Sequence, residues 1–337
     1  MYKPDFQILL LYWMLETRRY FMKKRETMIP NAQSRPDNIA GSTVAGCADR
    51  GKPVKNTSSC ICFLYSTVPG RFFLKLIMKL HIDRYGARFL WTKYSKPLAR
   101  WYVKRNGISV SREEMERFGS FRDMFVRTRE PMPVDPVPNH LVSPCDGWLS
   151  VFPIDADSCF SIKNSYYQVK DFLQDAELAK NYQDGTCMVF RLCASDYHHY
   201  SYIDDGYQGK HHPIPGVLHS VQPIACEKYP VFVLNKRCWS LLTTEHFGPV
   251  VQCEIGALVI GGIFNEKENT RFRKGTEKGH FELAGSTIVL LFEPGQVQMR
   301  QELQEALSSS EEIRVLQGQW IATAEEDVPL GRKTAVT

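Results

Sequence analysis

The sequence predicts an α+β fold in which N-terminal amphipathic helices precede an antiparallel, β-rich core. The core is indicated from about residue 141 onward by short apolar runs rich in valine and isoleucine, which Gly and Pro turns divide. The clearest runs are CMVFRL (187–192), ALVIGGI (257–263) and STIVLLFE (286–293). The pattern lacks the alternating strand and helix units that a doubly wound parallel sheet requires.

The helical part begins with a strongly basic block at residues 71–105, which holds ten Lys/Arg and a single acid, Asp83. An apolar stripe at helical spacing runs through the block: Phe73, Leu76, Ile77 and Leu80. Aromatic residues lie among the charges. A basic amphipathic helix of this kind suits an anionic membrane surface. The alternative is a solvated helix whose apolar stripe packs on its own domain.

A second amphipathic helix is predicted within residues 113–130, with one apolar face: Phe118, Phe121, Met124 and Phe125. Four prolines between residues 131 and 138 then favour an extended connection to the core. Near the C-terminus we expect a short helix at Glu302–Ala306 and a last strand pair within Val315–Thr323.

The composition of the chain excludes some classes of protein. Its 337 residues are 43% hydrophobic and 23% charged, which is ordinary for a globular protein with one large core or two modest ones. A formal net charge of +5, without a zinc-finger or RNA-binding signature, does not indicate a nucleic-acid partner. Ten cysteines without a CxxC pair favour buried, reduced thiols.

Four segments are expected along the chain. Residues 1–64 are interpreted as a poorly ordered extension and linker, because residues 26–62 are rich in Pro, Gly, Ser, Asn and Thr. The apolar run Phe6–Leu15 has about half of the length that crosses a bilayer, so it is either an interfacial anchor or part of the extension. The other segments are a basic helical docking region (65–138), the β-rich core (139–325) and a polar tail (326–337).

The strongest chemical signal is the stretch KGTEKGHFELAGSTIVLLFEPG (274–295), which places Gly285-Ser286-Thr287 directly before a β-run. A serine hydroxyl that follows a glycine carbonyl can attack the peptide bond in front of it, because glycine has no Cβ to block the approach. The same AGST tetrapeptide occurs at Ala40–Thr43, but no glycine-spaced basic loop precedes it and no β-run follows it. We interpret that copy as a chance repeat.

On this stretch, and on VSPCDG (142–147) and DYHHY (196–200), the chain resembles the phosphatidylserine decarboxylases from about Tyr65 to Thr323. These are pyruvoyl enzymes that mature by self-cleavage at a Gly-Ser bond. The resemblance implies cleavage between Gly285 and Ser286, which gives a long β chain, a short α chain and a covalent pyruvoyl group from Ser286. That group would form a Schiff base with the substrate's amine and accept electrons as CO2 leaves, so neither a metal nor pyridoxal phosphate is expected.

The resemblance also implies roles for polar residues. Asp146 matches the family's aspartate that orients a catalytic histidine, although the residues alone also fit a Pro-x-Asp-Gly turn. His198 matches the first histidine of the family's Asp-Tyr-His-Arg-x-His segment. This chain departs from the segment at two positions: His199 replaces the arginine, and Ser201 replaces the second histidine. We expect His198 to be the base. His219, after a Pro-Gly turn, is the second candidate, and His199 is a further catalytic or substrate-binding candidate.

Other polar residues are interpreted more simply. His211 and His212 are expected to be exposed in a polar loop, and the absence of HxxxH or HExxH spacing argues against a metal site. Lys274 and Lys278 precede the scissile bond and are candidates for binding a lipid phosphate.

The sequence therefore predicts a proenzyme that converts phosphatidylserine to phosphatidylethanolamine and CO2 at the cytoplasmic face of a membrane, as a peripheral protein. Its expected partners are phosphatidylserine, an anionic membrane surface and, after cleavage, its own two chains; whether it forms a homodimer is left open. One alternative is a pyruvoyl decarboxylase of a free aromatic amino acid on the same scaffold. Another is a membrane-binding relative that never cleaves.

Overall fold

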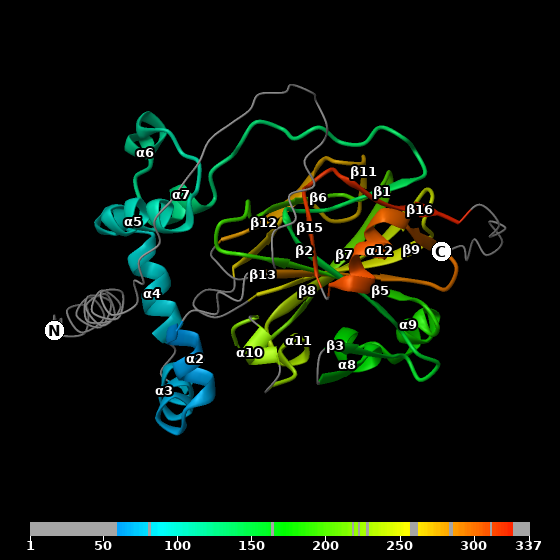
Figure 1. The fold of residues 1–337 in the computed structure, drawn as a ribbon, viewed down its shortest axis with the longest axis horizontal. Coiled ribbons are helices and arrows are strands. Elements are labelled where there is room, and N and C mark those ends of the chain that lie inside the picture. The colour runs from blue at the N-terminus through cyan, green and yellow to red at the C-terminus, as the bar shows by residue number, and fades with distance from the viewer. Residues whose placement is uncertain are drawn as a thin grey trace, which may run out of the picture. The chain divides into compact units, whose positions relative to one another are not determined.

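The computed structural model describes residues 59–79, 82–162, 165–217, 219–221, 223–226, 229–256, 262–282, 286–310 and 312–325 (Figure 1). Several predictions concern residues outside these ranges: the apolar run Phe6–Leu15, the linker up to residue 58, the Ala40–Thr43 copy and the polar tail. Residues 257–261 of one predicted strand also lie outside them, and the short strand β10 (Ile263–Asn265) begins two residues later.

Short helices make up the described chain before residue 126. They are α2 (Ser59–Ser66), α3 (Val68–Lys79), α4 (Ile82–Leu90), η1 (Lys93–Ser95), α5 (Lys96–Asn106), α6 (Arg112–Arg117) and α7 (Phe121–Phe125). The basic block is therefore helical, as predicted, but is divided among several helices. Because α2 begins at Ser59, the predicted boundary between residues 64 and 65 falls inside a helix.

The single helix predicted within residues 113–130 is wrong, because the chain forms two helices there. Ser111 accepts a hydrogen bond from the backbone N–H of Glu114, whose carboxylate accepts one from Ser111, and this capping box starts α6. Ser120 is extended and accepts from the backbone N–H of Asp123, which starts α7. The second cap interrupts the apolar periodicity from which one helix was predicted.

An antiparallel eight-stranded sheet is the main element of the core, as predicted (Figure 1), and its strand order is β11-β7-β8-β9-β13-β5-β2-β15. In that order the strands are β11 (Thr270–Phe272), β7 (Gly206–Ile214), β8 (Arg237–Thr244), β9 (Pro249–Ile255), β13 (Ser286–Phe292), β5 (Thr186–Leu192), β2 (Gly147–Pro153) and β15 (Ile313–Val315).

Smaller elements surround this sheet. One three-stranded sheet joins β1 (His140–Val142), β16 (Trp320–Ala324) and β14 (Val297–Met299), and another joins β10, β12 (Glu277–Phe281) and β6 (His199–Ser201). β3 (Cys159–Ile162) pairs with β4 (Ser165–Gln168). The remaining helices are α8 (Val169–Leu173), α9 (Ala176–Ala179), η2 (Lys180–Tyr182), α10 (Pro223–Cys226), α11 (Val231–Leu234) and α12 (Gln301–Ser309).

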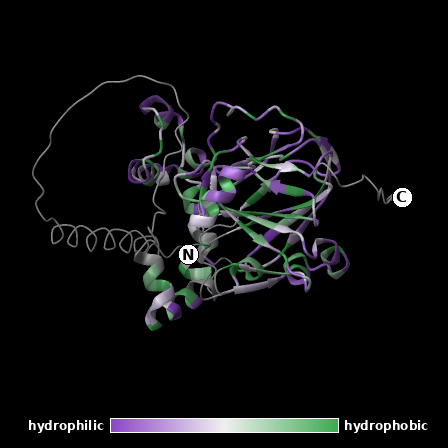
Figure 2. Cartoon of the chain, turned by 45° about the vertical axis from the view of Figure 1, so that its right-hand side comes forward, coloured by the Kyte–Doolittle hydropathy of each residue, from purple (hydrophilic) through white to green (hydrophobic). Residues whose placement is uncertain are grey.

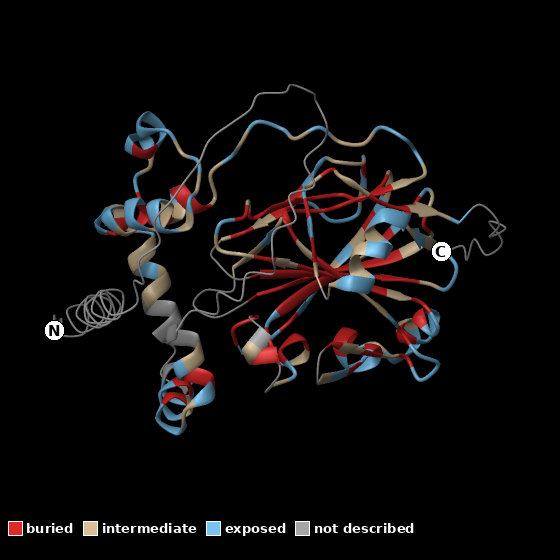
Figure 3. Cartoon of the chain, in the orientation of Figure 1, coloured by how far each residue is buried: buried red, intermediate tan, exposed pale blue. Residues whose placement is uncertain are grey.

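β13 separates two hydrophobic cores, because its side chains point alternately to the two faces of the sheet. Val289 and Leu291 belong to the first core, which also contains residues of α8, α9, α10 and α11. Ile288 and Leu290 belong to the second core, together with residues of β6, β12 and β16. Every residue of β13 is buried. Figure 2 shows hydrophobic residues along the strands of this sheet, and Figure 3 shows that most of these strands are buried.

Two further predictions are corrected by the sheet. The strands near the C-terminus do not pair with each other: β15 pairs with β2, and β16 pairs with β1 and β14. His211 and His212 lie in strand β7 rather than in a loop. His211 is half-buried, with its ring bonded to Gln208, whereas His212 is exposed and stacks on Trp239.

Close packing joins α2 to α3. A Cβ at Gly70 would lie only 2.0 Å from the carbonyl oxygen of Phe63, so only glycine permits this approach. Leu64 and Tyr65 of α2 and Leu74 of α3 are buried in the first core.

A fully buried ion pair lies on the second-core face of the sheet. The Nζ of Lys278 on β12 donates to Glu254 on β9 at 2.8 Å, and both side chains have no exposed surface. Gln252 and Asn265 donate to the same carboxylate, so the charges are also hydrogen-bonded. Lys278 is therefore unavailable to a lipid phosphate. The Nζ of Lys274 is bonded to backbone carbonyls, among them those of Pro138 and His140.

Removing this buried ammonium should destabilise the fold strongly. Lys278→Met leaves the Glu254 carboxylate buried without its cation, and breaking a buried pair in this way costs about 3–5 kcal/mol. Urea unfolding followed by circular dichroism would measure the loss. The matched control is Lys180→Met, which breaks a pair with Glu177 whose side chains are 62% and 84% exposed. Such pairs contribute about 0–1 kcal/mol, so equal losses in the two variants would contradict the expectation.

Candidate active site

Ser286 lies where the ends of four neighbouring strands meet. It is the first residue of β13, and its Cα partner is the last residue of β5. One position further, Thr287 pairs with Arg191 on one side and with Ile255, the last residue of β9, on the other. Arg191 also pairs with Trp148, the second residue of β2. We call this row of strand ends the cleavage edge; its members are Gly147, Leu192, Ser286 and Ile255.

The side chain of Ser286 is 1% exposed and lies on the same face of the sheet as Ile288, toward the second core. Thr287 lies on the opposite face. Its Oγ1 is buried and makes no hydrogen bond with any described residue. Residues 283–285 are outside the description, so the geometry of the bond between Gly285 and Ser286 is not part of it.

His198 lies near the Ser286 end of β13. It follows the last residue of β5 by six positions, and its backbone carbonyl accepts a hydrogen bond from Phe281, five residues before Ser286. The ring is 1% exposed and lies 4.4 Å from the ring of Phe125, centroid to centroid. Burial lowers the pKa of His198 from 6.5 to about 4. The imidazole is therefore neutral at physiological pH.

The hydrogen bonds of His198 fix its tautomer. Nδ1 lies 2.9 Å from the backbone carbonyl of Asp196, and a carbonyl oxygen only accepts, so Nδ1 carries the proton. Nε2 is then an unprotonated nitrogen, and it is buried without a hydrogen-bond partner among the described residues. A buried basic nitrogen with no partner is the kind of atom that a proton-transfer step requires.

His219 lies on the other face of the sheet and is bonded differently. Its Nδ1 is 3.2 Å from the hydroxyl of Tyr65, which also accepts from the backbone N–H of Ser220. Nδ1 of His219 is therefore already engaged in a hydrogen bond with a side chain. Asn235 bonds to the backbone of His219 and donates to the carbonyl of Gly256, next to the cleavage edge. Burial lowers the pKa of His219 as well.

Asp146 lies directly before β2, at the cleavage edge, and is 5% exposed. Both of its oxygens accept from the guanidinium of Arg129, at 2.5 and 3.1 Å, and Oδ1 also accepts from the backbone N–H of Gln317. Among the described residues no hydrogen bond joins Asp146 to His198 or His219. The expected aspartate–histidine pair is therefore not formed in this structure.

Ser201, which stands where the family has its second histidine, lies beside the Asp146 segment. Its backbone N–H and its hydroxyl both donate to the carbonyl of Pro144, at 2.8 and 3.3 Å. The Asp146 carboxylate is bonded instead to Arg129, which the sequence did not single out because it lies in the aperiodic connection after α7.

His199 does not point to the cleavage edge. Its Nδ1 lies 2.7 Å from Oε1 of Glu277, and its Nε2 lies 3.2 Å from the carbonyl of Val126. Its ring stacks between those of Tyr197 and His280. The structure thus brings His198 and Ser286 to one end of the sheet, Asp146 to the same edge, and His199 into a separate cluster.

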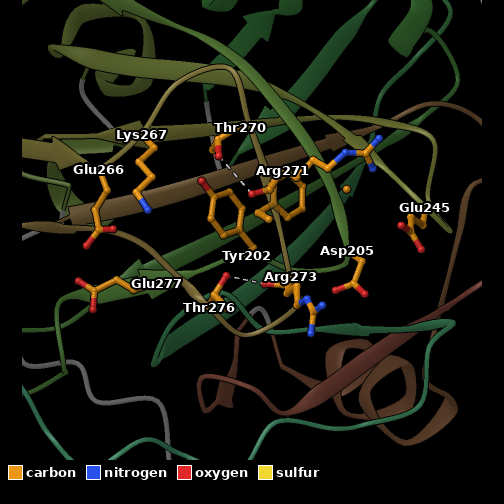
Figure 4. Close-up of a pocket in the computed structure, with 12 residues that line it drawn as sticks. Tyr202, Asp205, Glu245, Glu266, Lys267, Thr270, Arg271, Arg273, Thr276 and Glu277 are labelled. Carbon is orange, nitrogen blue, oxygen red and sulfur yellow. Dashed lines mark hydrogen bonds between the residues drawn. The ribbon is translucent and has the colours of Figure 1, made fainter.

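Two hollows among the described residues bear on the site. The larger, of about 740 Å³, is lined by polar side chains of β11 and its neighbours and includes Glu277 (Figure 4). It does not include Ser286 or His198. The smaller, of about 270 Å³, is lined mainly by apolar residues such as Val151, Val189 and Phe232, and also by Arg191, the Cα partner of Thr287. The smaller hollow is therefore the one next to the cleavage edge.

Comparisons with known proteins identify the family. The family model for phosphatidylserine decarboxylase matches residues 121–323. The chain belongs to the phosphatidylserine decarboxylase family. The phosphatidylserine decarboxylase proenzyme 2 of Clostridium acetobutylicum is 38% identical over 262 residues, which cover 77% of this chain and 90% of that protein. The phosphatidylserine decarboxylase proenzyme of Clostridium botulinum is 35% identical over 271 residues, covering 78% and 92%.

The proenzyme of Desulfitobacterium hafniense is 35% identical over 270 residues, covering 77% of this chain and 90% of that protein. The resemblance that the sequence suggested is confirmed, and with it membership of a family of decarboxylase enzymes. The match from residue 121 includes the segments of Asp146, His198 and Ser286. Their individual roles stay predictions.

Replacing His198 should flatten the pH dependence of stability. Between a folded pKa of about 4 and an unfolded value near 6.5, the unfolded chain binds the extra proton, so stability falls as pH drops through this window. His198→Asn keeps a donor for the Asp196 carbonyl but does not titrate. Between pH 7 and pH 5, the unfolding free energy of the natural chain should fall by about 2 kcal/mol more than that of the variant.

Urea unfolding at the two pH values measures this difference. Val68→Ala, at an apolar residue that is 72% exposed and carries no titratable group, is the control and should keep the natural slope. A His198→Asn variant with that same slope would show that His198 is not held neutral by burial.

Proposed function

We propose that the chain is a self-cleaving decarboxylase that converts phosphatidylserine into phosphatidylethanolamine and CO2 with a pyruvoyl group derived from Ser286. Family membership supports the decarboxylase, and the relatives' names describe proenzymes. The observation that carries the proposal is the presence, at one end of the sheet, of a buried serine that begins β13 and an imidazole with a free, unprotonated Nε2.

In this proposal the Oγ of Ser286 attacks the carbonyl carbon of Gly285, and Nε2 of His198 takes the hydroxyl proton. The peptide C–N bond breaks, the proton passes to the leaving amine, and an ester joins Gly285 to Oγ. Loss of the Cα proton of Ser286 then expels the Gly285 carboxylate. The remaining dehydroalanine takes up water and loses ammonia, which leaves the pyruvoyl group. The low pKa of His198 favours the first step, because its imidazole is already unprotonated.

His198 is preferred to His219 as the base because of their hydrogen bonds. Nε2 of His198 has its lone pair free, whereas Nδ1 of His219 is already bonded to the hydroxyl of Tyr65. The residues present also fit the pyruvoyl group, since the hydroxyl of Thr287, the next residue, and the Nε2 of His198 both lack a hydrogen-bond partner among the described residues. Once formed, the group would supply the carbonyl that binds the substrate's amine and the electron sink for loss of CO2. His198 could then return a proton to the substrate carbon.

Ser286→Ala should abolish cleavage, because alanine has no hydroxyl to attack Gly285. Intact-mass measurement should find a single chain of 38.8 kDa in the variant, and two chains in the natural protein, the shorter one beginning with a blocked residue 286. Ser42→Ala, in the second AGST copy, is the matched control and should cleave normally. An uncut, folded natural chain would favour the non-cleaving alternative.

The substrate is tested with the cleaved protein on phosphatidylserine liposomes and, separately, on free amino acids. Release of CO2 from the liposomes supports the proposal. Release only from free amino acids would contradict the lipid substrate while leaving self-cleavage intact.

We also propose that α2 and α3 dock on an anionic bilayer. Five apolar residues of this helical segment are 37–72% exposed, and we call them the docking face: Phe63, Val68, Phe72, Phe73 and Leu76. Figure 3 shows the exposed residues along α3. The residue of α3 that packs into the core is Leu74, which lies off the predicted stripe.

This arrangement favours docking over the alternative in which the stripe packs on its own domain. Phe73 and Leu76 of the stripe face outward, and the side chains of Ile77 and Leu80 are outside the description. Arg71 and Lys75 on the same helix would meet anionic head groups. Within the described residues no helix has the length and apolar character needed to span a membrane.

Replacing Phe72 and Phe73 together by serine should weaken binding to phosphatidylserine liposomes. Burying one such side chain contributes about 1.5–3 kcal/mol, so the double variant should bind at least about 10-fold less tightly in flotation assays. Tyr166→Ser is the control, because Tyr166 is 79% exposed and belongs to β4 rather than to these helices. Equal binding by the double variant and the control would contradict docking through this face.

A further inference from the structure

Three potential metal ligands meet on the outer side of the β6–β12 pair. One nitrogen each of His199 and His280 and one carboxylate oxygen of Glu277 all lie within 4.8 Å of one another. His199 and His280 are direct Cα partners across the two strands. Directly opposed residues of antiparallel strands have their Cβ atoms about 5 Å apart and point to the same face. A cross-strand pair of this kind places two imidazoles side by side, and their ring centroids are 4.9 Å apart.

A bulge in β12 brings the third ligand to this face. Glu277 and His280 are three residues apart, and in a regular strand such residues point to opposite faces. The register of β12 against β6 shifts between Glu277 and Gly279, which adds one residue to β12 at that point. Lys278 is consequently directed inward to its buried ion pair, while Glu277 and His280 share the outer face.

The hydrogen bonds of His199 require a cation beside Glu277. Nε2 faces the carbonyl of Val126 at 3.2 Å and must donate to it, so Nε2 carries a proton. Nδ1 faces Oε1 of Glu277 at 2.7 Å. A neutral ring would place two acceptors against each other there, so either a second proton or a metal ion must lie between them. A ligating histidine whose other nitrogen donates to a backbone carbonyl is the usual arrangement in metal sites.

We propose that His199, Glu277 and His280 bind one Zn²⁺ ion, which fastens β6 to β12 beside His198. Two imidazoles and a carboxylate form a common three-ligand set for Zn²⁺, with a fourth position for water. With bonds of about 2.0–2.1 Å, tetrahedral ligand atoms lie about 3.3 Å apart. The most distant pair must therefore approach by at most about 1.5 Å, and His199 Nδ1 and Glu277 Oε1, which are 2.7 Å apart, must separate slightly. Glu277 can move, because its side chain is 40% exposed. It also lines the 740 Å³ hollow, which gives the ion an entry path (Figure 4).

Calorimetric titration of the chelator-treated full chain with ZnCl2 tests the site, and Co²⁺ absorption spectra report the ligand set. We expect one equivalent of Zn²⁺ to bind and the melting temperature to rise with its concentration. His280→Ala removes a ligand and should lower the affinity by more than the about 10- to 100-fold that loss of an outer-shell partner costs. Glu277→Gln keeps a hydrogen-bonding group of the same size, so it serves as a second variant if His280→Ala does not fold.

His211→Ala is the matched control. His211 also pairs with a carboxylate, that of Glu268 at 3.2 Å, but no three-residue ligand group among the described residues includes it. The control should bind Zn²⁺ as the natural chain does. Absence of saturable binding, or unchanged binding in His280→Ala and Glu277→Gln, would show that His199 and Glu277 form only an ion pair. Repeating the zinc titration with the Ser286→Ala variant shows whether Zn²⁺ binds independently of self-cleavage.

Discussion

The structure depends most on the hydrogen bonding of β13 along both of its edges. Its ladder with β5 begins at Ser286 and its ladder with β9 at Thr287, so a cut in front of Ser286 removes none of these pairs. The segment after the cut also contributes β15 to β2 and β16 to β1. Since every side chain of β13 is buried, a short chain that begins at Ser286 would stay attached to the long chain through sheet pairing and both cores.

The antiparallel order also explains why distant parts of the sequence meet at Ser286. In adjacent antiparallel strands the start of one lies beside the end of the next. The start of β2, the end of β5, the start of β13 and the end of β9 therefore form one row. The turn after β5 carries His198, and the residue before β2 is Asp146. The position of these candidate residues at one edge is thus a consequence of strand order.

The sequence predicted the elements better than it predicted their contacts. The apolar runs identified β5 and β13, because valine and isoleucine in short runs have a strong local preference. The partners of β15 and β16 and the bulge in β12 depend on register, which no local pattern encodes. The same limit applies to the site. The motif located His198 and Asp146, but the Arg129 contact of Asp146 and the Tyr65 contact of His219 involve residues on other elements. Lys278 was misjudged because its acidic partner, Glu254, lies on another strand.

The proposed docking helices are connected to the candidate site by a chain of hydrogen bonds. Phe63 of α2 belongs to the exposed docking face, and Tyr65, two residues later, is fully buried. The hydroxyl of Tyr65 bonds to His219, and Asn235 links the backbone of His219 to the carbonyl of Gly256 at the end of β9. Buried polar groups joined in this way hold their elements in one arrangement, because each broken bond would leave an unpaired group. In the proposed function, a helix bound at the bilayer surface would therefore hold the position of the strand end beside Ser286, where the lipid head group would react.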